Sequence, residues 1–180
     1  MKARKSVLSV FPLLVAGILS GCSSNKAPDV TDNIRKSLDQ AGYKDISVSE
    51  DREKGVVTLT GSVPTDSDKQ QAEAIVKSSA SNLVVADQIA VRPPGNESEA
   101  KAVDSDLDKA IEKNLDATLV KHRLNKNVKY DVKNGVVTLK GDLSSQAKRE
   151  QVEKLAASVP NVKQVVNEIE VKGQKATSTS

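Results

Sequence analysis

The sequence predicts an α+β protein built from two tandem copies of one small unit. The first observation is a repeated string: residues 55–61 read Gly-Val-Val-Thr-Leu-Thr-Gly, and residues 135–141 read Gly-Val-Val-Thr-Leu-Lys-Gly, 80 positions later. The second is that apolar residues around the string recur at the same offset, where Ala72, Ile75, Val76, Val85, Ile89 and Val91 are matched by Val152, Leu155, Ala156, Val165, Ile169 and Val171. A fixed offset indicates a duplicated unit. We therefore expect two αββαβ modules, each a small mixed three-stranded sheet covered by two helices.

The first module, residues 29–92, begins with a predicted helix and two strands. Apolar residues that recur every three or four positions define the helix, and a glycine follows them: Val30, Ile34, Leu38, Ala41 and then Gly42. Ile46 and Val48 alternate with serines as a strand. The repeated string forms the next strand, bracketed by Gly55 and Gly61, where the backbone needs conformations that side chains oppose.

A second helix and a third strand complete this module. Thr65 and Asp68 form a capping-box-like start of the helix. The apolar face of the helix and the closing strand follow in order: Ala72, Ile75, Val76 and Ser79, then Val85, Ile89 and Val91. Strands joined through a helix pair in parallel, whereas a hairpin pairs antiparallel, so each module should contain a mixed sheet.

The second module, residues 104–172, repeats this order. Ser105 and Asp108 predict the start of its first helix, Asn134 and Gly135 predict a tight hairpin turn, and Pro160 ends its second helix. The residues that define its elements are, in order, Leu107, Ile111 and Leu115 for the first helix; Val128, Tyr130 and Val132 for the first strand; Val136 to Leu139, bracketed by Gly135 and Gly141, for the second strand; Val152, Leu155, Ala156 and Val159 for the second helix; and Val162 to Val171 for the last strand.

Two polar segments lie outside the modules. Residues 93–103 begin with Pro93, Pro94 and Gly95 and lack periodic apolar residues, which predicts a linker. Residues 173–180 have almost nothing to bury, which predicts a disordered tail.

The N-terminus resembles the export signal of a bacterial lipoprotein. Residues 1–21 combine early positive charges with a short apolar run, too short to span a membrane. They end in Leu-Ser-Gly before Cys22, which resembles a lipobox, whose cysteine carries the lipid. Residues 22–28 would then be a tether, and Ser23 favours the periplasmic face of the outer membrane. The alternative is a soluble secreted protein with one unmodified thiol, since Cys22 is the only cysteine.

The charge balance argues against a nucleic-acid partner. Without residues 1–21 the chain has 24 Lys and Arg against 24 Asp and Glu and is formally neutral. An exported protein also rarely meets nucleic acid, so we expect no partner of that class.

The residue inventory predicts neither an enzyme nor a metal site. His122 is the only histidine and lies among cations, whereas a transition-metal site needs several converging ligands. The acidic run from Asp104 to Asp108 lacks the alternating loop of a calcium-binding hand and is better explained as a helix start. We therefore expect no catalytic residues, metal or cofactor.

The duplicated pattern resembles the BON domain of bacterial envelope proteins. The resemblance rests on the two Gly-Val-Val-Thr-Leu-x-Gly strings, the closing runs at residues 84–91 and 165–171, and both helices in each copy. Two-copy chains of this family resemble either soluble, osmotically induced periplasmic proteins or outer-membrane lipoproteins, and Leu19 to Cys22 favour the second. The resemblance implies binding of phospholipid surfaces and support of envelope integrity, without catalysis.

The two copies differ in charge. Residues 29–92 have 8 Lys and Arg against 11 Asp and Glu, a net charge of −3, and residues 104–172 have 13 against 11, a net charge of +2. A basic segment in the second copy provides the candidate lipid-surface residues: Lys121, Arg123, Lys126, Lys129 and Lys133. Cations near an anionic lipid surface gain about 1 kcal/mol each. A solvated face is the alternative interpretation.

Three functional hypotheses follow. The first is a lipid-anchored protein whose basic segment binds an anionic phospholipid membrane surface. The second is a periplasmic adaptor that binds an envelope protein, for example by adding a partner strand to an exposed sheet edge. The third is an osmotic-stress-related binding protein for small ions.

Overall fold

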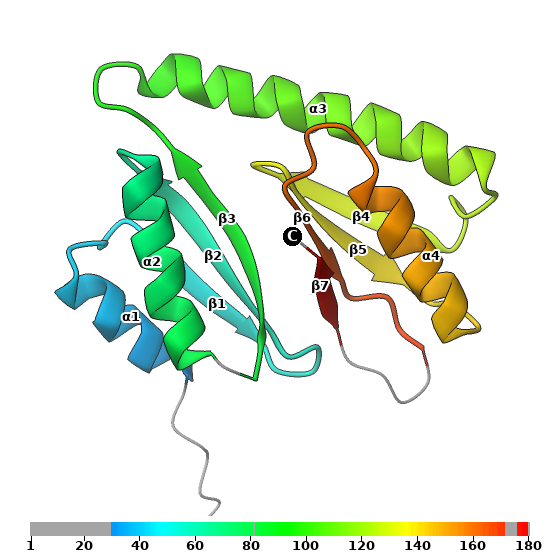
Figure 1. Ribbon diagram of the computed structural model, residues 1–180, viewed down its shortest axis with the longest axis horizontal. Coiled ribbons are helices and arrows are strands. Elements are labelled where there is room, and N and C mark those ends of the chain that lie inside the picture. The colour runs from blue at the N-terminus through cyan, green and yellow to red at the C-terminus, as the bar shows by residue number, and fades with distance from the viewer. Residues whose placement is uncertain (1–29, 81, 172–175, 180) are drawn as a thin grey trace, which may run out of the picture.

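The computed structural model describes residues 30–80, 82–171 and 176–179. The predicted export signal at 1–21, Cys22 and the tether at 22–28 lie outside the described residues. The elements in chain order are α1 (Val30–Gln40), β1 (Ser47–Asp51), β2 (Val56–Val63), α2 (Asp66–Ser79), β3 (Val84–Val91), α3 (Glu97–Lys121), β4 (Val128–Lys133), β5 (Val136–Gly141), α4 (Gln146–Ala157), β6 (Gln164–Asn167) and β7 (Thr177–Thr179). The α+β prediction and the repeated αββαβ order are confirmed (Figure 1).

Each module contains the predicted mixed sheet. In the first, β1 pairs antiparallel with β2, and β2 pairs in parallel with β3. In the second, β4 pairs antiparallel with β5, and β5 pairs in parallel with β6. The crossover helices α2 and α4 explain the parallel pairs, because a chain that returns through a helix enters the sheet in its original direction.

Two aliphatic cores hold the helices on one face of each sheet. In the first module Ile34 and Leu38 of α1 meet Val57 and Leu59 of β2 and Val76 of α2. In the second module the corresponding core residues from α3, α4, β4 and β5 are Ile111, Leu115, Leu119, Val152, Ala156, Val128, Val132, Val137 and Leu139. Fully burying a side chain of this size contributes about 1.5–3 kcal/mol. The apolar residues spaced three and four positions apart in the sequence are therefore those on the helix faces that pack against the sheets.

Glycines at equivalent positions allow close backbone approach in both modules. Gly61 has a φ of +128° and Gly141 a φ of +131°. A Cβ atom on Gly61 would lie 2.3 Å from the carbonyl oxygen of Asp45, and one on Gly141 would lie 2.1 Å from that of Asn127. Both contacts would be steric clashes, so the backbone before β1 and β4 requires glycine there. Gly55 and Gly135 also have positive φ, of +69° and +82°.

The start of α3 differs from the prediction. The helix begins at Glu97 rather than near Ser105, so most of the expected linker at 93–103 is helical. Ser105 and Asp108 therefore lie inside the helix and do not cap it. Asp108 instead accepts hydrogen bonds from the backbone N–H groups of Asn134 and Gly135, both at 2.8 Å. Its carboxylate is a tertiary contact, which local sequence pattern does not reveal.

The tail also differs from the prediction of disorder at 173–180 where the structure describes it, at residues 176–179; residues 173–175 and 180 lie outside the described residues. Residues 177–179 form β7, which pairs antiparallel with β6 and gives the second sheet a fourth strand. Thr177 Oγ1 donates a hydrogen bond to Glu153 Oε2 at 2.8 Å, and the hydroxyl of Thr179 donates to the same carboxylate. Strand pairing and hydroxyl contacts hold this segment, and Ala176 directly before it packs against apolar residues of both modules.

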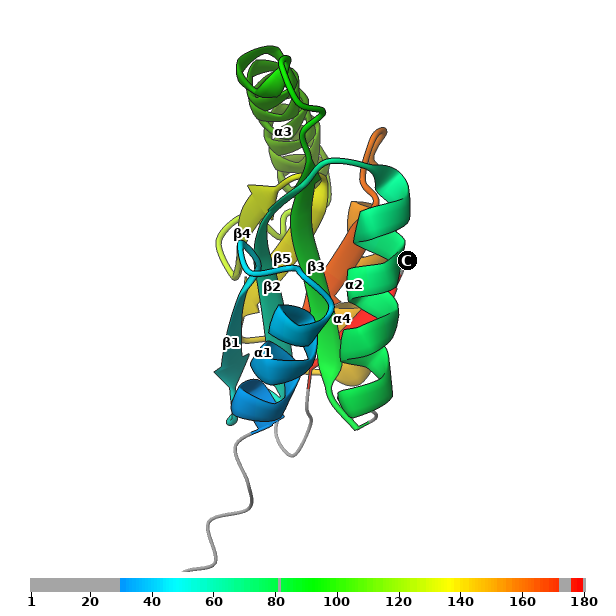
Figure 2. The same cartoon turned by 90° about the vertical axis from the view of Figure 1, so that its left-hand side faces the viewer.

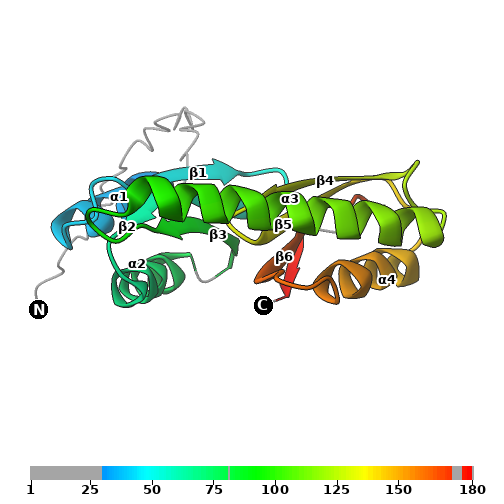
Figure 3. The same cartoon turned by 90° about the horizontal axis from the view of Figure 1, so that it is seen from above.

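The two modules pack against each other through the sheet faces that carry no helix. Val56 of β2 and Ala86 of β3 meet Val136 of β5 and Val166 of β6 in a small apolar cluster. Figure 1 shows α1 and α2 on one outer side and α4 on the other, and Figures 1 and 3 show α3 passing over both modules. Figure 2 shows α3 nearly end-on, above the sheets.

A side-chain amide also joins the modules. Gln164 of β6 accepts a hydrogen bond from the backbone N–H of Asp87 at 3.0 Å and donates one to the carbonyl of Val85 at 2.7 Å. In this way one glutamine satisfies two backbone groups on the free edge of β3. Its Nε2 also donates to Ser178 Oγ at 2.8 Å, so β7 is linked to the interface.

Candidate functional site

The structure places the five predicted cations along one side of the second module. Lys121 ends α3, Arg123 and Lys126 lie in the following turn, and Lys129 and Lys133 are on β4. All five side chains are exposed. A strand of this length spans about 20 Å, so the cations do not converge on one point. They form instead an outer cluster, which we define as Lys121, Arg123 and Lys126, and two lysines that continue along β4.

The two strand lysines have no cationic counterpart in the first module. Across the β4–β5 ladder Lys129 lies opposite Lys140, whereas Ser47 lies opposite Thr60 in the equivalent β1–β2 ladder. Lys133 and Asp51 are equivalent in the same way, because each lies opposite the first residue of the next strand. Like charges directly opposite each other destabilise a sheet. The Lys129 and Lys140 pair is therefore not explained by the stability of the fold.

Arg123 occupies a left-handed backbone position. Its φ is +58°, and the next residue, Leu124, donates its N–H to the carbonyl of Leu119 at 2.9 Å. The first module ends α1 in the same way, with Gly42 at a φ of +93° and Tyr43 donating to Leu38 at 2.9 Å. A side chain in this conformation costs about 1–2 kcal/mol, which glycine avoids. The second module thus has a cation where the fold favours glycine.

The hairpin turn at the other end of β4 lies at the junction of the modules. Asn134 and Gly135 form the two-residue turn that the sequence predicts, with φ values of +52° and +82°. Besides the two bonds to Asp108, Asn134 Nδ2 donates to the carbonyl of Gln88 in β3 at 2.8 Å. The turn is therefore fixed both to α3 and to the first module.

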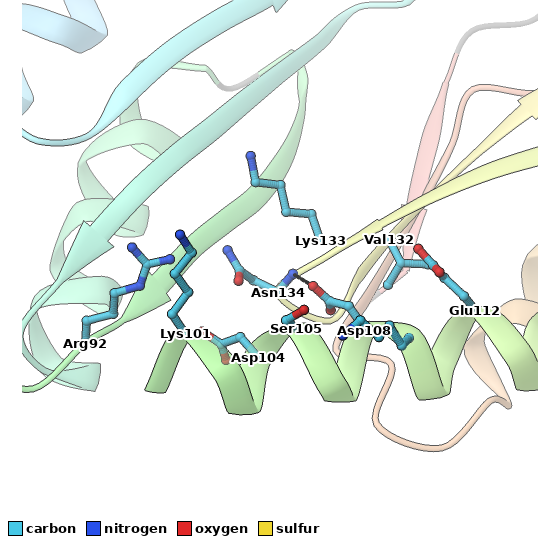
Figure 4. Close-up of a pocket in the computed structure, with 10 residues that line it drawn as sticks. Arg92, Lys101, Asp104, Ser105, Asp108, Glu112, Val132, Lys133 and Asn134 are labelled. Carbon is cyan, nitrogen blue, oxygen red and sulfur yellow. Dashed lines mark hydrogen bonds between the residues drawn. The ribbon is translucent and has the colours of Figure 1, made fainter. Parts of the chain in front are cut away.

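Beside this turn lies a hollow of about 400 Å³, which we call the junction cavity (Figure 4). Four basic residues line it: Arg92 after β3, Lys101 and Lys109 on α3, and Lys133 on β4. The acidic residues in the lining are Asp104, Asp108 and Glu112. Only Lys133 belongs to the predicted basic segment. Arg92 and Lys101 were missed because they come from the end of one module and the expected linker.

Several polar groups of the junction cavity lack a protein partner. Among the described residues, Arg92, Lys101 and Lys133 form no ion pair, whereas Lys109 Nζ lies 3.1 Å from Asp106 Oδ1. Arg92 Nε and Asp104 Oδ2 are buried and without any hydrogen-bond partner in the described part of the chain. Buried polar atoms are satisfied in the large majority of cases, so each such atom needs an explanation.

A second hollow between the modules is mainly acidic. It is lined by Asp51 and Lys54 from the first module and by Lys140, Glu168 and Glu170 from the second. Burial raises the pKa of Glu168, and the charge of Asp51 adds to this effect, while Lys140 and Lys54 oppose it. Lys54 forms an ion pair with Glu170 across the interface. This hollow contributes charge pairing to the docking of the modules.

A buried polar group occupies the same place in both modules. Asp87 Oδ1 accepts the N–H of Ile89 at 3.1 Å, and Asn167 Oδ1 accepts the N–H of Ile169 at 3.2 Å. Burial raises the pKa of Asp87, although Lys69 lies 3.5 Å from its Oδ2 and lowers it. Because a neutral amide fills the same role in the second module, we interpret this carboxylate as structural.

The remaining predicted residues do not add a reactive centre. His122 is exposed and follows the last residue of α3. Across residues 30–80, 82–171 and 176–179, no three His, Cys, Asp or Glu side chains are grouped so that they could hold a metal ion. Cys22, the predicted lipid acceptor, is outside the described residues. The described site is therefore a charged surface and a polar cavity, which suit binding.

Comparison with known proteins identifies the repeated unit. A model of the BON domain matches residues 26–93 and again residues 104–173. The chain belongs to the BON domain family. A BON relative is osmotically-inducible protein Y of Escherichia coli strain K12, which is 28% identical over 146 residues, 79% of this chain and 71% of that protein.

Two solved structures of CdsD, a structural protein of the type III secretion system of Chlamydia trachomatis, show a weak likeness to the BON pair. One, the C-terminal domain, has a TM-score of 0.33 and 15% identity, and the match covers 80% of this chain and 97% of that chain. The other has a TM-score of 0.31 and 17% identity, and covers 79% of this chain and 61% of that chain. Scores of this size carry no argument about fold or function.

No helix among the described residues of the BON pair has both the length and the apolar character needed to cross a bilayer.

Proposed function

We propose that this chain is a lipid-anchored envelope protein whose tandem BON modules bind phospholipid membrane surfaces and support envelope integrity. Its predicted location is the periplasmic face of the outer membrane, with the anchor on Cys22. The observation that carries the proposal is the outer cluster: three exposed cations in the second module, one of them in a backbone position where the first module has glycine.

The surroundings of the outer cluster suit contact with a lipid headgroup layer. Val120, next to Lys121 on the last turn of α3, is 51% exposed, so an apolar side chain accompanies the cations. Interfacial binding combines apolar contact with attraction to anionic lipids. Each cation near an anionic leaflet gains about 1 kcal/mol, which falls off within a Debye length of about 8 Å at physiological salt. The expected binding is weak and depends on salt.

A lipid anchor would make such weak contacts effective. A surface held beside the bilayer meets the headgroups at a high effective concentration, so contacts of low intrinsic affinity become occupied. The relationship to osmotically-inducible protein Y supports an envelope location and a connection with osmotic stress. The Leu-Ser-Gly-Cys sequence before residue 23 supports the anchor.

Charge reversal of the outer cluster tests the proposal. Replacing Lys121, Arg123 and Lys126 with Glu removes three attractions of about 1 kcal/mol each and adds repulsion, so the affinity for vesicles containing anionic lipid should fall by about 100-fold or more. The matched control reverses three exposed lysines elsewhere, Lys36, Lys44 and Lys148. Co-sedimentation of the purified chain with vesicles measures both. Equal loss in the two triple variants would contradict the assignment of the surface.

The anchor is tested in cells by replacing the predicted acceptor. The substitution Cys22→Ser should move the chain from the membrane fraction to the soluble fraction, and the control Ser23→Ala should leave it with the membranes. Recovery of the original chain in the soluble fraction with a free thiol would refute the anchor.

An adaptor role is the second candidate, and the sheet edges favour it. Among the described strands β1 pairs only with β2, and β4 pairs only with β5, so each module has an edge strand with free backbone groups. An extended segment of an envelope protein could add to such an edge. Crosslinking in cells from a residue placed on β4 should then capture a reproducible protein neighbour, and failure to capture one counts against this role.

A further inference from the structure

We propose that the junction cavity is a binding site for a phosphoryl group that carries a nearby ammonium donor, the chemistry of a phosphoethanolamine headgroup. This site is separate from the outer cluster, since it lies at the opposite end of β4 and includes residues of both modules. Its volume of about 400 Å³ lies within the range of roughly 300–1,000 Å³ typical of small-molecule sites.

Three cations of the cavity supply the phosphoryl part of the site. Arg92 follows β3, Lys101 lies on α3 and Lys133 on β4, and none of the three forms an ion pair among the described residues (Figure 4). Hydrogen bonds between charged donors and phosphate are about twice as strong as neutral ones, and the planar guanidinium suits a phosphate group in particular. Arg92 also has a buried Nε without a partner, which a phosphoryl oxygen would satisfy.

Asp104 explains why a simple anion is a poor match. Its Oδ2 is buried and unpartnered in the lining of the same cavity, and an ionised phosphodiester group, which has no O–H, would leave that oxygen unsatisfied. An unpaired buried polar group costs about 1–3 kcal/mol. A ligand that brings a donor as well as a phosphoryl group satisfies both Arg92 and Asp104. A primary ammonium group donates such a bond, whereas the quaternary ammonium of choline has no N–H.

The floor of the cavity is fixed before any ligand binds. Asp108 accepts two backbone hydrogen bonds from the hairpin turn, and Asn134 of that turn is bonded to the carbonyl of Gln88. Of the two other carboxylates in the lining, Asp108 and Glu112, that of Asp108 is therefore already paired and does not compete for the ammonium group. A site held in place in this way loses less conformational entropy on binding.

Two soluble compounds test the ligand class. In calorimetric titration of the purified full chain, glycerophosphoethanolamine should bind at least about tenfold more tightly than glycerophosphocholine, because only the first can donate to Asp104. Inorganic phosphate should also bind more weakly than glycerophosphoethanolamine. Equal affinity for the two glycerophosphodiesters, or no binding of either, would overturn the proposal.

Two substitutions assign the roles of the cavity residues. Arg92→Gln should weaken the binding of glycerophosphoethanolamine by about tenfold or more, whereas its matched control, Lys36→Gln on α1, should leave this binding unchanged. Asp104→Asn should remove the preference for ethanolamine over choline, whereas Asp39→Asn on α1 should preserve it. Circular dichroism checks that each variant is folded. A folded Arg92→Gln variant that binds as tightly as the original chain would refute the site.

Vesicles distinguish a lipid source from a soluble one. If the ligand is a lipid headgroup, neutral vesicles containing phosphatidylethanolamine should bind more chain than neutral vesicles of phosphatidylcholine alone, and Arg92→Gln should abolish the difference. If the ligand is a free compound, only the soluble probe will show the preference. The triple reversal of the outer cluster should leave the soluble titration unchanged, so failure of the proposed membrane function is distinguishable from failure of this site.

Discussion

At the residue scale, the most informative position is Arg123. The first module ends its first helix with Gly42, and the second ends the equivalent helix with an arginine in the same left-handed conformation. Residues held in sparsely populated conformations cluster at functional sites, where another requirement outweighs the strain. The proposed binding of an anionic surface would supply such a requirement, because the side chain is exposed and has cationic neighbours in the sequence.

The substitution Arg123→Gly separates this function from stability. Glycine removes the strain but raises the entropy of the unfolded chain, so the free energy of unfolding should stay within about 1 kcal/mol of its original value. Vesicle binding should weaken about fivefold, since one cation contributes about 1 kcal/mol. Urea unfolding and co-sedimentation measure the two effects.

Asn161→Gly is the control for this prediction. Asn161 also has a positive φ, of +68°, but carries no charge. Its replacement should change stability in a similar way and leave vesicle binding unaltered. A loss of binding in this variant, or none in Arg123→Gly, would contradict the role of the arginine.

At the element scale, β7 shows how a polar tail becomes ordered. Burial tends to raise the pKa of Glu153, but hydrogen bonds from Thr179, Asn167 and Thr177 and the charge of Arg149 lower it below its usual value. An acid whose pKa is lowered by folding stabilises the protein above the unfolded pKa and loses this contribution as the pH falls through the folded pKa. The attachment of β7 should therefore weaken in acid.

Replacing Thr177 and Thr179 with Ala tests this attachment. The double variant should lose about 1–2 kcal/mol of stability at neutral pH, and the loss should shrink as the pH falls through the lowered folded pKa of Glu153, where its carboxylate becomes protonated. Urea unfolding across this pH range gives the difference. In a Glu153→Gln background the two substitutions should cost less. A loss that is independent of pH would show that the carboxylate is not the partner that matters.

The sequence pattern predicted the helices and strands that bury apolar faces. It failed to predict elements whose bounds or order depend on polar tertiary contacts. The stripes at Ile34 and Ile111 and the Asn134 turn were recognisable because their spacing matches helix and hairpin geometry. The start of α3 was not recognisable, because the spacing of Ser105 and Asp108 is that of a helix cap, whereas Asp108 in fact accepts hydrogen bonds from a turn distant in the sequence. The strand β7 has no apolar alternation, so nothing in its local sequence distinguishes it from a disordered tail.

The candidate site was only partly predictable for the same reason. The basic segment is contiguous in the sequence, and its exposure follows from its polarity. The junction cavity brings together Arg92, Lys101 and Lys133, which are up to 41 positions apart in the chain. Their proximity depends on how the two modules dock, and this packing was not deducible from the pattern of either copy.

At the scale of the whole molecule, the docking of the two modules determines which of their surfaces stay exposed. Their helix-free sheet faces pack together, and Gln164 satisfies the edge of β3, so neither surface is open to a partner. The outer cluster lies at the end of the second module, away from the interface, and remains exposed. The duplication thus builds one body, in which the net charge of −3 in the first copy and +2 in the second distinguishes the copy that we propose to contact the membrane.

The most direct test of the account is the binding of the purified chain to vesicles as the fraction of anionic lipid and the salt concentration are varied. Attraction between exposed cations and headgroups is screened by salt, with a Debye length of about 10 Å at 0.1 M and about 3 Å at 1 M. We predict binding that rises with anionic lipid at low salt and is largely lost near 1 M salt. Binding that is absent at low salt, or that is indifferent to both lipid charge and salt, would contradict the account.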